Sequence, residues 1–382
     1  MRIVFLSNFI NHHQIGVGEE LFSLTDGSYR FIETEPMPES FKKRGYPDYS
    51  SRDYVVQAWN GEENERYAKS LLMEAEVVVF GGVGKVFELV KNRIDAGLLT
   101  FEMGERWLKR GWINTLSPRL QKAFWTYHLH RWSRKPFYYL CASAYAPNDL
   151  YLLHEFKDKC YKWGYFTSVK RCDDLVIKEQ KSENHISFMW CARFLNWKHP
   201  EMPVLLAERL KRNGCRFVID LFGDGEEFEN TKLLIQQKNL EECVLLRGNL
   251  PNNEILGEMR RHDIYLFTSD QNEGWGAVLN EAMANGCVPV AADAIGSVPF
   301  LVRDGENGMI FKSKDIDSLE EKVNVILNNK KYIMEMSAKA KETMQLWSPK
   351  VAAFRLLKLI ESLKNGRGTP FTDGPCSKAY PI

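Results

Sequence analysis

Short apolar runs alternate with longer segments of helical spacing along most of this chain. Runs this apolar are typical of strands buried on both faces, as in parallel sheets. In the first half, the strands that the pattern predicts are Ile3–Leu6, Tyr29–Ile32, Tyr54–Ala58, Val77–Phe80, Leu98–Phe101 and Tyr138–Cys141. In the second half, they are Ile186–Cys191, Phe217–Phe222, Val244–Leu246, Ile264–Thr268, Val288–Ala291 and Met309–Phe311. Because strand and helix alternate twice over, we expect two doubly wound α/β domains.

The boundary between these domains is expected near residues 165–184, where strand candidates stop and charged residues accumulate. Pro349 breaks the chain again, and a last helix follows it. The expected parts are a first domain, a second domain, a last helix and a loose Gly/Pro-rich tail, at residues 1–170, 171–348, 349–364 and 365–382. Ligands of doubly wound sheets bind at the carboxyl ends of the strands, so a cleft between the domains is the default site.

Composition excludes several classes of protein. The chain has 382 residues, is 44% hydrophobic and has a net charge of +1, so it is neither disordered nor a general nucleic-acid coat. No run approaches about 18 apolar residues, so no membrane span is expected, and the N-terminal run is too short for a signal peptide. The 8 cysteines contain no CxxC pair, and the histidines lack the spacing of common zinc motifs. We expect a cytoplasmic protein with reduced thiols and no metal site, while metal or disulfide roles for the cysteines stay open.

The most informative segment is Asn272–Gly286, NEGWGAVLNEAMANG, which follows an expected strand and opens a helix near Ala277. Gly274 and Gly276 let the backbone approach a ligand closely, because a Cβ there would collide with it. The N-terminus of the helix then presents unpaired N–H groups, which suit a phosphate. This combination predicts a phosphate-containing ligand at the turn.

Two carboxylates flank the same turn. Glu281 lies about one turn into the helix, where it can bind the hydroxyl pair of a ribose. Glu273 precedes the glycines and can face a sugar attached beyond the phosphates. An acidic helix cap after a Gly-rich turn would give a similar pattern, but carboxylates on both sides of a Gly-aromatic-Gly turn favour the ligand site.

Two neighbouring strand ends carry further candidates. Arg193 and Lys198 follow the strand Ile186–Cys191, and together they can neutralise a diphosphate, the Arg as a fork and the Lys as a point charge. A solvated cation pair would look the same in sequence. Gly223-Asp224 closes the next strand in a tight turn that leaves room for a flat group, although a plain β–α turn remains open as an alternative.

The second half resembles the carboxyl domain of retaining family 4 glycosyltransferases (glycosyl transferases group 1), which have the GT-B fold. The matching pieces occur in the family's order over about residues 185–345. They are Arg193 with Lys198, the Phe-Gly-Asp-Gly turn at 222–225, Arg247-Gly248, the Glu273/Glu281 pair, and the segments 292–296 and 302–308. The resemblance implies two Rossmann-like domains facing each other across a cleft, with a C-terminal helix that crosses back to pack on the first domain.

By this resemblance, the substrate is a nucleotide-diphosphate sugar, either a UDP- or a GDP-sugar, and no cofactor is needed. Arg193 and Lys198 would bind the diphosphate, Glu281 the ribose, and Glu273 with the Gly274–Gly276 backbone the transferred sugar. The catalytic residues would be Arg193, Lys198 and Glu273. The donor-binding residues would be Gly223, Asp224, Arg247, Gly274, Trp275, Gly276, Ala277 and Glu281.

Both halves depart from the family's pattern in places. The first loop lacks the usual Gly-Gly pair, Ala192 replaces the glycine common before the diphosphate arginine, and no clear counterpart exists of the histidine that many members place in the first domain. Candidate acceptor or first-domain loop residues are His12, His13, Gly16, Gly82 and Glu105. An ordinary structural role for each of them stays open.

Residues 106–135 mix cations with aromatic side chains. This window has 8 Lys/Arg, no Asp or Glu, and the tryptophans 107, 112, 125 and 132. Such a mixture suits the headgroups of an anionic bilayer, with Trp rings at the interface. We therefore expect peripheral contact with the inner face of the cytoplasmic membrane and a lipid-linked acceptor. A solvated basic face and a nucleic-acid surface are the alternatives, and no nucleic-acid fold signature accompanies the window.

These observations predict a glycosyltransferase of the hexosyltransferase type (EC 2.4), metal-independent and retaining, that acts on a saccharide or lipid-linked saccharide in surface polysaccharide or glycan assembly. The absence of a DxD-like carboxylate cluster in a suitable loop motivates the metal independence. The alternatives are a sugar-nucleotide epimerase, a phosphorylase of the same fold, and a non-catalytic subunit that binds a sugar nucleotide.

Overall fold

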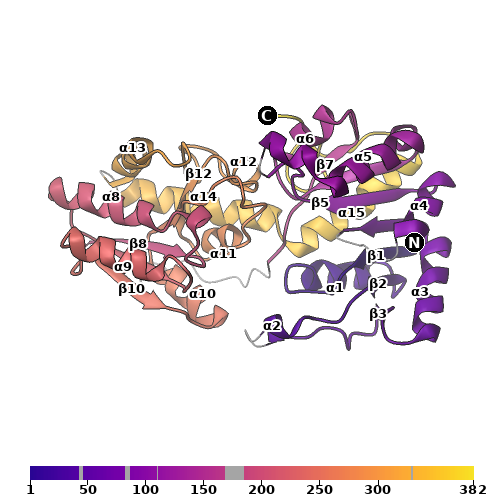
Figure 1. The fold of residues 1–382 in the computed structure, drawn as a ribbon, viewed down its shortest axis with the longest axis horizontal. Coiled ribbons are helices and arrows are strands. Elements are labelled where there is room, and N and C mark those ends of the chain that lie inside the picture. Colours follow the sequence, from indigo (N-terminus) through magenta and orange to yellow (C-terminus); the bar gives the residue numbers. More distant parts are fainter. Residues whose placement is uncertain (43–45, 82–86, 110, 168–184, 328–329) are drawn as a thin grey trace. The chain divides into compact units, whose positions relative to one another are not determined.

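The computed structural model describes residues 1–42, 46–81, 87–109, 111–167, 185–327 and 330–382. The chain divides into two compact units (Figure 1). Unit 1 comprises Met1–Ser168 together with Leu346–Ile382, and unit 2 comprises Val169–Gln345. Among the described residues, no helix is long and apolar enough to cross a membrane.

Unit 1 contains a parallel sheet of seven strands in the order β3-β2-β1-β4-β5-β6-β7. The strands are β1 (Ile3–Ser7), β2 (Tyr29–Glu33), β3 (Val55–Gln57), β4 (Val77–Phe80), β5 (Thr100–Gly104), β6 (Phe137–Cys141) and β7 (Cys160–Lys162). The flanking helices are α1 (Ile15–Leu24), α2 (Glu39–Lys42), α3 (Glu62–Glu74), α4 (Phe87–Asp95), α5 (Pro118–Leu129), α6 (Ala146–Leu152) and α15 (Pro349–Lys364), with the short 3₁₀ turns η1 (Gly111–Leu116) and η2 (Trp132–Arg134). Every residue of β1 and β4 is buried, as their apolar sequences predict.

Unit 2 contains a parallel sheet of six strands in the order β10-β9-β8-β11-β12-β13. The strands are β8 (Ile186–Cys191), β9 (Phe217–Phe222), β10 (Val244–Gly248), β11 (Ile264–Phe267), β12 (Val288–Ala292) and β13 (Met309–Phe311). Helices flank this sheet as well (Figure 1). They are α8 (Glu201–Arg212), α9 (Phe228–Gln237), α10 (Asn252–Arg261), α11 (Val278–Ala284), α12 (Val298–Leu301), α13 (Ile316–Leu327) and α14 (Lys330–Leu346), together with η3 (Asn196–Lys198).

The two sheets have the doubly wound topology that the sequence predicts, so the expected fold class is confirmed. In each sheet the strand order reverses once, between β1 and β4 in unit 1 and between β8 and β11 in unit 2. Ligands of such sheets bind where the order reverses, beyond the carboxyl ends of the strands. The loops after these four strands are therefore where a site is expected.

The last helix, α15, packs against α1 within unit 1. Gly16 makes this close approach possible, because a Cβ at that position would lie 2.9 Å from Cγ of Pro349. The structure therefore gives Gly16 a packing role, which differs from the acceptor-loop role expected from the sequence.

Residues 365–382 do not form the loose tail that the sequence predicts. Cys376 and Ser377 are fully buried, and the segment runs along the edge strand β7. The Cys376 N–H donates to the Lys162 carbonyl at 2.7 Å, and the Lys162 N–H donates to the Ser377 carbonyl at 2.8 Å. The Gly/Pro content of the segment predicts a loose tail. The residues around Cys376 nevertheless pair with β7, which lies far away in the sequence.

Candidate functional site

The loops that follow β8 and β11 are joined by hydrogen bonds in unit 2. The Thr268 hydroxyl donates to the Lys198 carbonyl at 2.7 Å and accepts from the Trp190 indole at 2.9 Å. The Asp270 N–H donates to the Trp197 carbonyl at 3.0 Å. These bonds hold the segment that carries Lys198 next to the segment that leads to Glu273.

Lys198 and Glu273 form an ion pair across the two loops. Their side chains are 11% and 12% exposed, so the pair is largely withdrawn from water. The Ser269 hydroxyl also donates to the same Glu273 oxygen, at 3.1 Å. The Lys198 ammonium lies 4.3 Å from the centre of the Trp197 ring, where a cation–π interaction adds to its placement. Two of the three expected catalytic residues are thus in direct contact.

Arg193 follows β8 in the same loop as Lys198, but its environment is different. Its side chain is exposed, and no hydrogen bond or ion pair to it occurs within the described part of the chain. A guanidinium presents five donors in a planar fork that matches a phosphate or carboxylate. Arg193 is therefore free to bind an anion without first leaving a partner.

Glu281 lies on α11 near the end of β8. Burial raises the pKa of its carboxyl to about 7, and a hydrogen bond from Asn252 at 3.5 Å opposes this shift weakly. Burial raises the pKa of the Cys191 thiol to about 12, and the charges of Glu281 and Lys198 also act on that thiol. Because Cys191 ends β8, both charged side chains lie close to this strand end. The Glu281 carboxylate has acceptor capacity that the hydroxyls of a ribose could fill.

The Gly223–Gly225 turn is shaped by its contact with the loop after β8. Gly223 has φ +127°, and a Cβ there would lie 1.9 Å from the Ala192 carbonyl oxygen. Gly225 has φ +151°, and its Cβ would lie 2.5 Å from the Phe194 carbonyl oxygen. Both glycines are required by this close approach. Asp224 is exposed, and one of its oxygens accepts from the Gly225 N–H at 2.7 Å.

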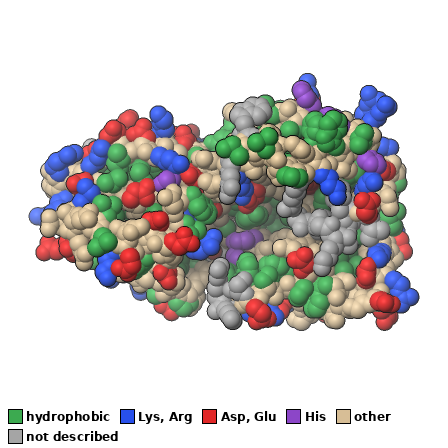
Figure 2. Space-filling model, viewed as in Figure 1, with side chains coloured by type: hydrophobic (Ala, Val, Ile, Leu, Met, Phe, Trp, Pro, Cys, Tyr) green, Lys and Arg blue, Asp and Glu red, His purple; other side chains and the backbone are tan. Residues whose placement is uncertain are grey.

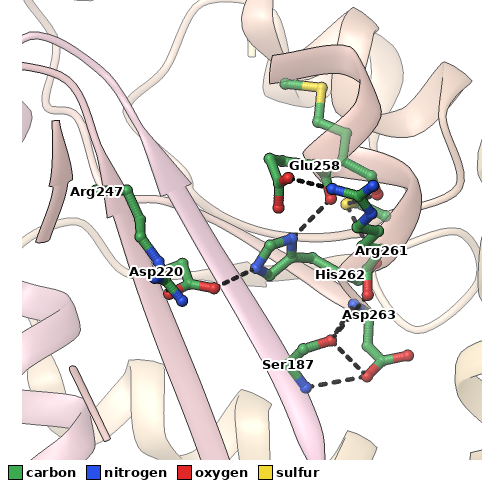
Figure 3. A network of polar contacts seen from close by, with 9 residues as sticks. Ser187, Asp220, Arg247, Glu258, Arg261, His262 and Asp263 are labelled. Atoms are coloured by element: carbon green, nitrogen blue, oxygen red, sulfur yellow. Dashed lines mark hydrogen bonds and ion pairs between the residues drawn. The ribbon is translucent and has the colours of Figure 1, made fainter. Parts of the chain in front are cut away.

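Arg247 belongs to a buried polar network in which it binds Asp220 (Figure 3). Its Nε donates to Asp220 at 2.8 Å, and the other Asp220 oxygen accepts from His262 Nε2 at 2.9 Å. Burial would raise the pKa of Asp220, but the hydrogen bonds from His262 and Arg247 outweigh it and the pKa falls below its usual value. His262 Nδ1 lies 2.7 Å from the Glu258 carbonyl, so both ring nitrogens face acceptors. Arg247 is thus fixed in place, with its side chain still half exposed.

Trp275 differs from its expected role in donor binding. Its ring is fully buried, and its indole N–H donates to Asn280 at 2.9 Å, so the side chain is part of the core. The adjacent Gly276 has φ +80°, and a Cβ there would lie 2.3 Å from the Phe267 ring. Gly274 is buried, and Ala277 caps α11. At Trp275 only the backbone remains available to a ligand.

In unit 1, three of the candidate residues meet near the carboxyl ends of β1 and β5. His12 and His13 pack ring against ring with centroids 3.7 Å apart, and His13 also stacks on Tyr165 at 5.1 Å. The Tyr165 hydroxyl donates to Glu105 at 2.8 Å, and Lys109 binds the other Glu105 oxygen. Burial lowers the pKa of His13 to about 3, so the ring is neutral near pH 7. Gly82 lies outside the described residues.

Comparison with known families identifies the second unit. Residues 173–343 match the family model described as Glycosyl transferases group 1. Unit 2 is similar to this family over most of its length. The residues that converge at the ends of β8 and β11 all belong to this matched segment.

Curated relatives match somewhat more than a third of this chain. An exopolysaccharide phosphotransferase of Streptomyces coelicolor is 27% identical over 150 residues, which is 39% of this chain and 16% of that protein. A poly(glycerol-phosphate) alpha-glucosyltransferase of Bacillus subtilis is 30% identical over 147 residues, which is 37% of this chain and 21% of that protein. The chain thus spans about a fifth or less of the length of these two relatives.

Solved structures match the chain over nearly its whole length. HepE of Anabaena in complex with UDP has a TM-score of 0.69 at 15% identity, covering 96% of this chain and 100% of that one. A glycosyltransferase from Rickettsia africae has a TM-score of 0.65 at 13% identity, covering 95% of this chain and 99% of that one. This chain therefore has the GT-B fold, as the sequence predicts.

Several residues at the site were not found from the sequence. Ser269 and Asn252 contact Glu273 and Glu281, and Tyr165 links His13 to Glu105. Ser269 directly follows the strand segment Ile264–Thr268, which is a weak signal, but its target oxygen could not be known. Tyr165 and Asn252 have no motif of their own, since their partners lie far away in the chain.

Proposed function

We propose that the protein is a retaining glycosyltransferase that uses a nucleotide-diphosphate sugar as its donor. The observation that supports this best is the convergence of Lys198, Glu273 and Glu281 at the β8/β11 end of a group 1 domain, with Arg193 unpaired in the same loop. Unit 2 would hold the donor, and unit 1 would supply residues for the acceptor. HepE, which shares the fold, is described in complex with UDP-glucose, which favours a UDP-sugar.

The proposed reaction breaks the bond between C1 of the sugar and the phosphate oxygen, and forms a bond from C1 to an acceptor hydroxyl oxygen. The hydroxyl proton passes to the departing phosphate, and a nucleoside diphosphate leaves. Negative charge grows on the leaving group as its bond breaks. Arg193 and Lys198 stabilise this charge, and such preorganised electrostatic stabilisation is usually a large term.

The proposal includes no metal ion, because two cations are available for the charge of the diphosphate. No covalent nucleophile is assigned, so departure and attack on the same face of the sugar are the simpler route to retention. The acceptor would be a saccharide or a lipid-linked saccharide in polysaccharide or glycan assembly. A relative in Salmonella typhimurium, 28% identical over 133 residues, is named a putative colanic acid biosynthesis glycosyltransferase, which supports a role in polysaccharide assembly.

A screen of nucleotide sugars tests the function. A donor that binds raises the apparent melting temperature by mass action. Slow release of free sugar and nucleoside diphosphate from that donor indicates a transferase. Binding without turnover supports a non-catalytic subunit, a changed sugar without cleavage supports an epimerase, and cleavage that requires inorganic phosphate supports a phosphorylase.

Replacing Glu281 by glutamine should weaken UDP binding about tenfold, because ribose hydroxyls would lose a charged acceptor. In the wild type, UDP should also bind more weakly near pH 6 than near pH 8. The Glu281 carboxyl has a pKa of about 7, so it is mostly protonated at pH 6 and mostly ionised at pH 8. Only the ionised carboxylate can accept charge-assisted hydrogen bonds from both ribose hydroxyls. Titration calorimetry at the two pH values measures both effects. UDP itself also titrates in this pH range, and E281Q, which lacks the carboxyl, shows how much of the pH dependence comes from UDP. An E281Q affinity for UDP equal to that of the wild type would contradict the ribose assignment.

We also propose that unit 1 contacts an anionic membrane through residues 106–135. Among the described side chains of this window, the most exposed apolar ones lie on η1 and α5: Ile113 (72%), Leu116 (74%), Trp125 (60%) and Leu129 (75%). Lys122 and Arg131 are exposed beside them. We name these six residues the basic–apolar surface. Figure 2 shows hydrophobic and basic side chains side by side where Figure 1 places α5.

The basic–apolar surface is smaller than the sequence suggests. Trp132 is fully buried and donates to Asp95 at 2.8 Å, and Trp107 donates to Tyr139 at 3.1 Å. Arg106 is paired with Asp149. The side chain of Trp112 lies outside the described part. Trp125 is therefore the tryptophan on which the membrane contact is proposed to depend.

Replacing Trp125 and Leu129 by serine should weaken binding to anionic vesicles about tenfold or more, because burial of both apolar side chains is lost. Flotation with vesicles of phosphatidylglycerol and phosphatidylcholine measures this binding. Leu152→Ser changes another exposed leucine of unit 1 outside the surface and should have no effect. Equal binding of the wild type to vesicles with and without phosphatidylglycerol would count against the proposal.

A further inference from the structure

Lys198 and Glu273 bind each other, although the proposed function assigns them to different parts of one donor. We propose that Glu273 and the diphosphate of the donor compete for the Lys198 ammonium, so that a bound diphosphate releases the Glu273 carboxylate for the sugar. This inference rests on the proposed function and adds a way for the site to distinguish a diphosphate-containing donor from a free sugar or nucleoside. The sugar-binding carboxylate would become available only when a diphosphate is present.

The fold brings the pair together independently of any ligand. Thr268 holds the Lys198 carbonyl, and Asp270 holds the Trp197 carbonyl, at 2.7 and 3.0 Å. The backbone on both sides of the pair is thus fixed by hydrogen bonds within unit 2. Only the two side chains are free to change partners, which makes an exchange possible without moving a loop.

The second hydrogen bond to Glu273 fixes which oxygen Lys198 must leave. Ser269 and Lys198 both bind Oε2 of Glu273. When Lys198 turns to a phosphate, Ser269 still donates to Oε2, so the carboxylate does not become an unpaired buried charge. Ser269 is therefore a positioning residue, which keeps Glu273 in place during the exchange.

The charges favour the exchange once a diphosphate arrives. An isolated carboxylate or ammonium is costly to bury, so each member of the resting pair offsets the desolvation of the other. A nucleoside diphosphate brings more negative charge than one carboxylate and would draw the ammonium away. Lys198 has three rotatable donors on a flexible stem and can turn while its ammonium stays near the Trp197 ring. A nucleoside without phosphates has no charge with which to displace Glu273.

The decisive variant is Glu273→Gln, which keeps the size of the side chain and removes its charge. It should bind UDP about tenfold more tightly than the wild type, because Lys198 no longer has to leave a carboxylate. Its hydrolysis of a nucleotide sugar should nevertheless be slower. A residue that only binds the sugar would leave UDP affinity unchanged, so titration calorimetry with UDP separates the two roles.

Two further variants protect this test. Ser269→Ala removes the hydrogen bond that Glu273 keeps after Lys198 has left, without removing a charge, and should weaken UDP binding about twofold. In a Lys198→Met background, Glu273→Gln should no longer tighten UDP binding, because no ammonium remains to be shared. A gain that persists there would indicate simple repulsion between Glu273 and the phosphates, and would overturn the inference.

Glu208→Gln is the matched control, since Glu208 forms an exposed ion pair with Lys238 in the same unit, at 2.7 Å. It should leave UDP affinity unchanged. If the wild type and this control bind UDP but Glu273→Gln binds it no more tightly, the inference is wrong and the proposed function stands. If wild type and control bind neither UDP nor any nucleotide sugar, the proposed function and the inference both fail.

Discussion

Arg193→Ala should lower the rate of sugar transfer about 10²- to 10³-fold, because it removes a charged donor aimed at the leaving diphosphate. The free energy of unfolding should hardly change. The Arg193 side chain is exposed and makes no hydrogen bond or ion pair within the described residues, so its removal leaves no buried group unpaired. Initial rates of nucleoside diphosphate release, together with urea unfolding, measure the two quantities.

The comparison with Lys198→Ala makes this test sharper. Lys198 is part of a largely buried ion pair, so its removal should reduce both the rate and the stability. Arg193→Lys keeps the charge but loses the planar fork, and should recover only part of the activity. Near-normal rates for both alanine variants would remove the diphosphate role from this loop.

Gly223→Ala should lower the free energy of unfolding by about 2–4 kcal/mol and abolish UDP binding. The Cβ would lie 1.9 Å from the Ala192 carbonyl oxygen, a backbone atom that cannot swing aside, and φ +127° is strained for alanine. To relieve the clash, the turn must move away from the loop that carries Arg193. Urea unfolding and calorimetry with UDP measure the two effects.

Gly257→Ala is the matched control for this substitution. Gly257 lies within α10 of the same unit, and the nearest atom to a new Cβ there is 3.8 Å away, at the end of the Arg260 side chain. Alanine is a better helix former than glycine, so this variant should be as stable as the wild type or slightly more stable. A Gly223→Ala protein as stable as this control would show that the turn has room to adjust.

The fold could be predicted because its main determinant is local. The runs at β8 and β9 are apolar from end to end, and both strands have the bounds that the pattern predicts. The strand β7 was missed because it has only three residues and is completed by the segment around Cys376, far along the chain. Pairing between distant short segments leaves no periodic signal in the sequence.

The site could be predicted only in part, for a related reason. Residue types at strand ends indicate an anion site, and Lys198 and Glu273 were found in this way. Their mutual contact could not be predicted, since they are 75 positions apart and each has a plausible role alone. Trp275 was assigned to the donor because of its neighbouring glycines, yet its ring fills the core and its indole binds Asn280. Spacing shows which backbone reaches a site, but tertiary packing decides where a large ring points.

The segment around Cys376 that runs along β7 has a consequence for how the protein behaves in solution. A parallel sheet that ends in a bare strand offers unpaired N–H and C=O groups to any other extended chain. Here the N–H groups of Cys376 and Ala379 bind the carbonyls of Lys162 and Cys160, at 2.7 and 3.1 Å. A protein truncated after residue 364 would expose the edge strand β7. The truncated molecules would then aggregate through their β7 edges.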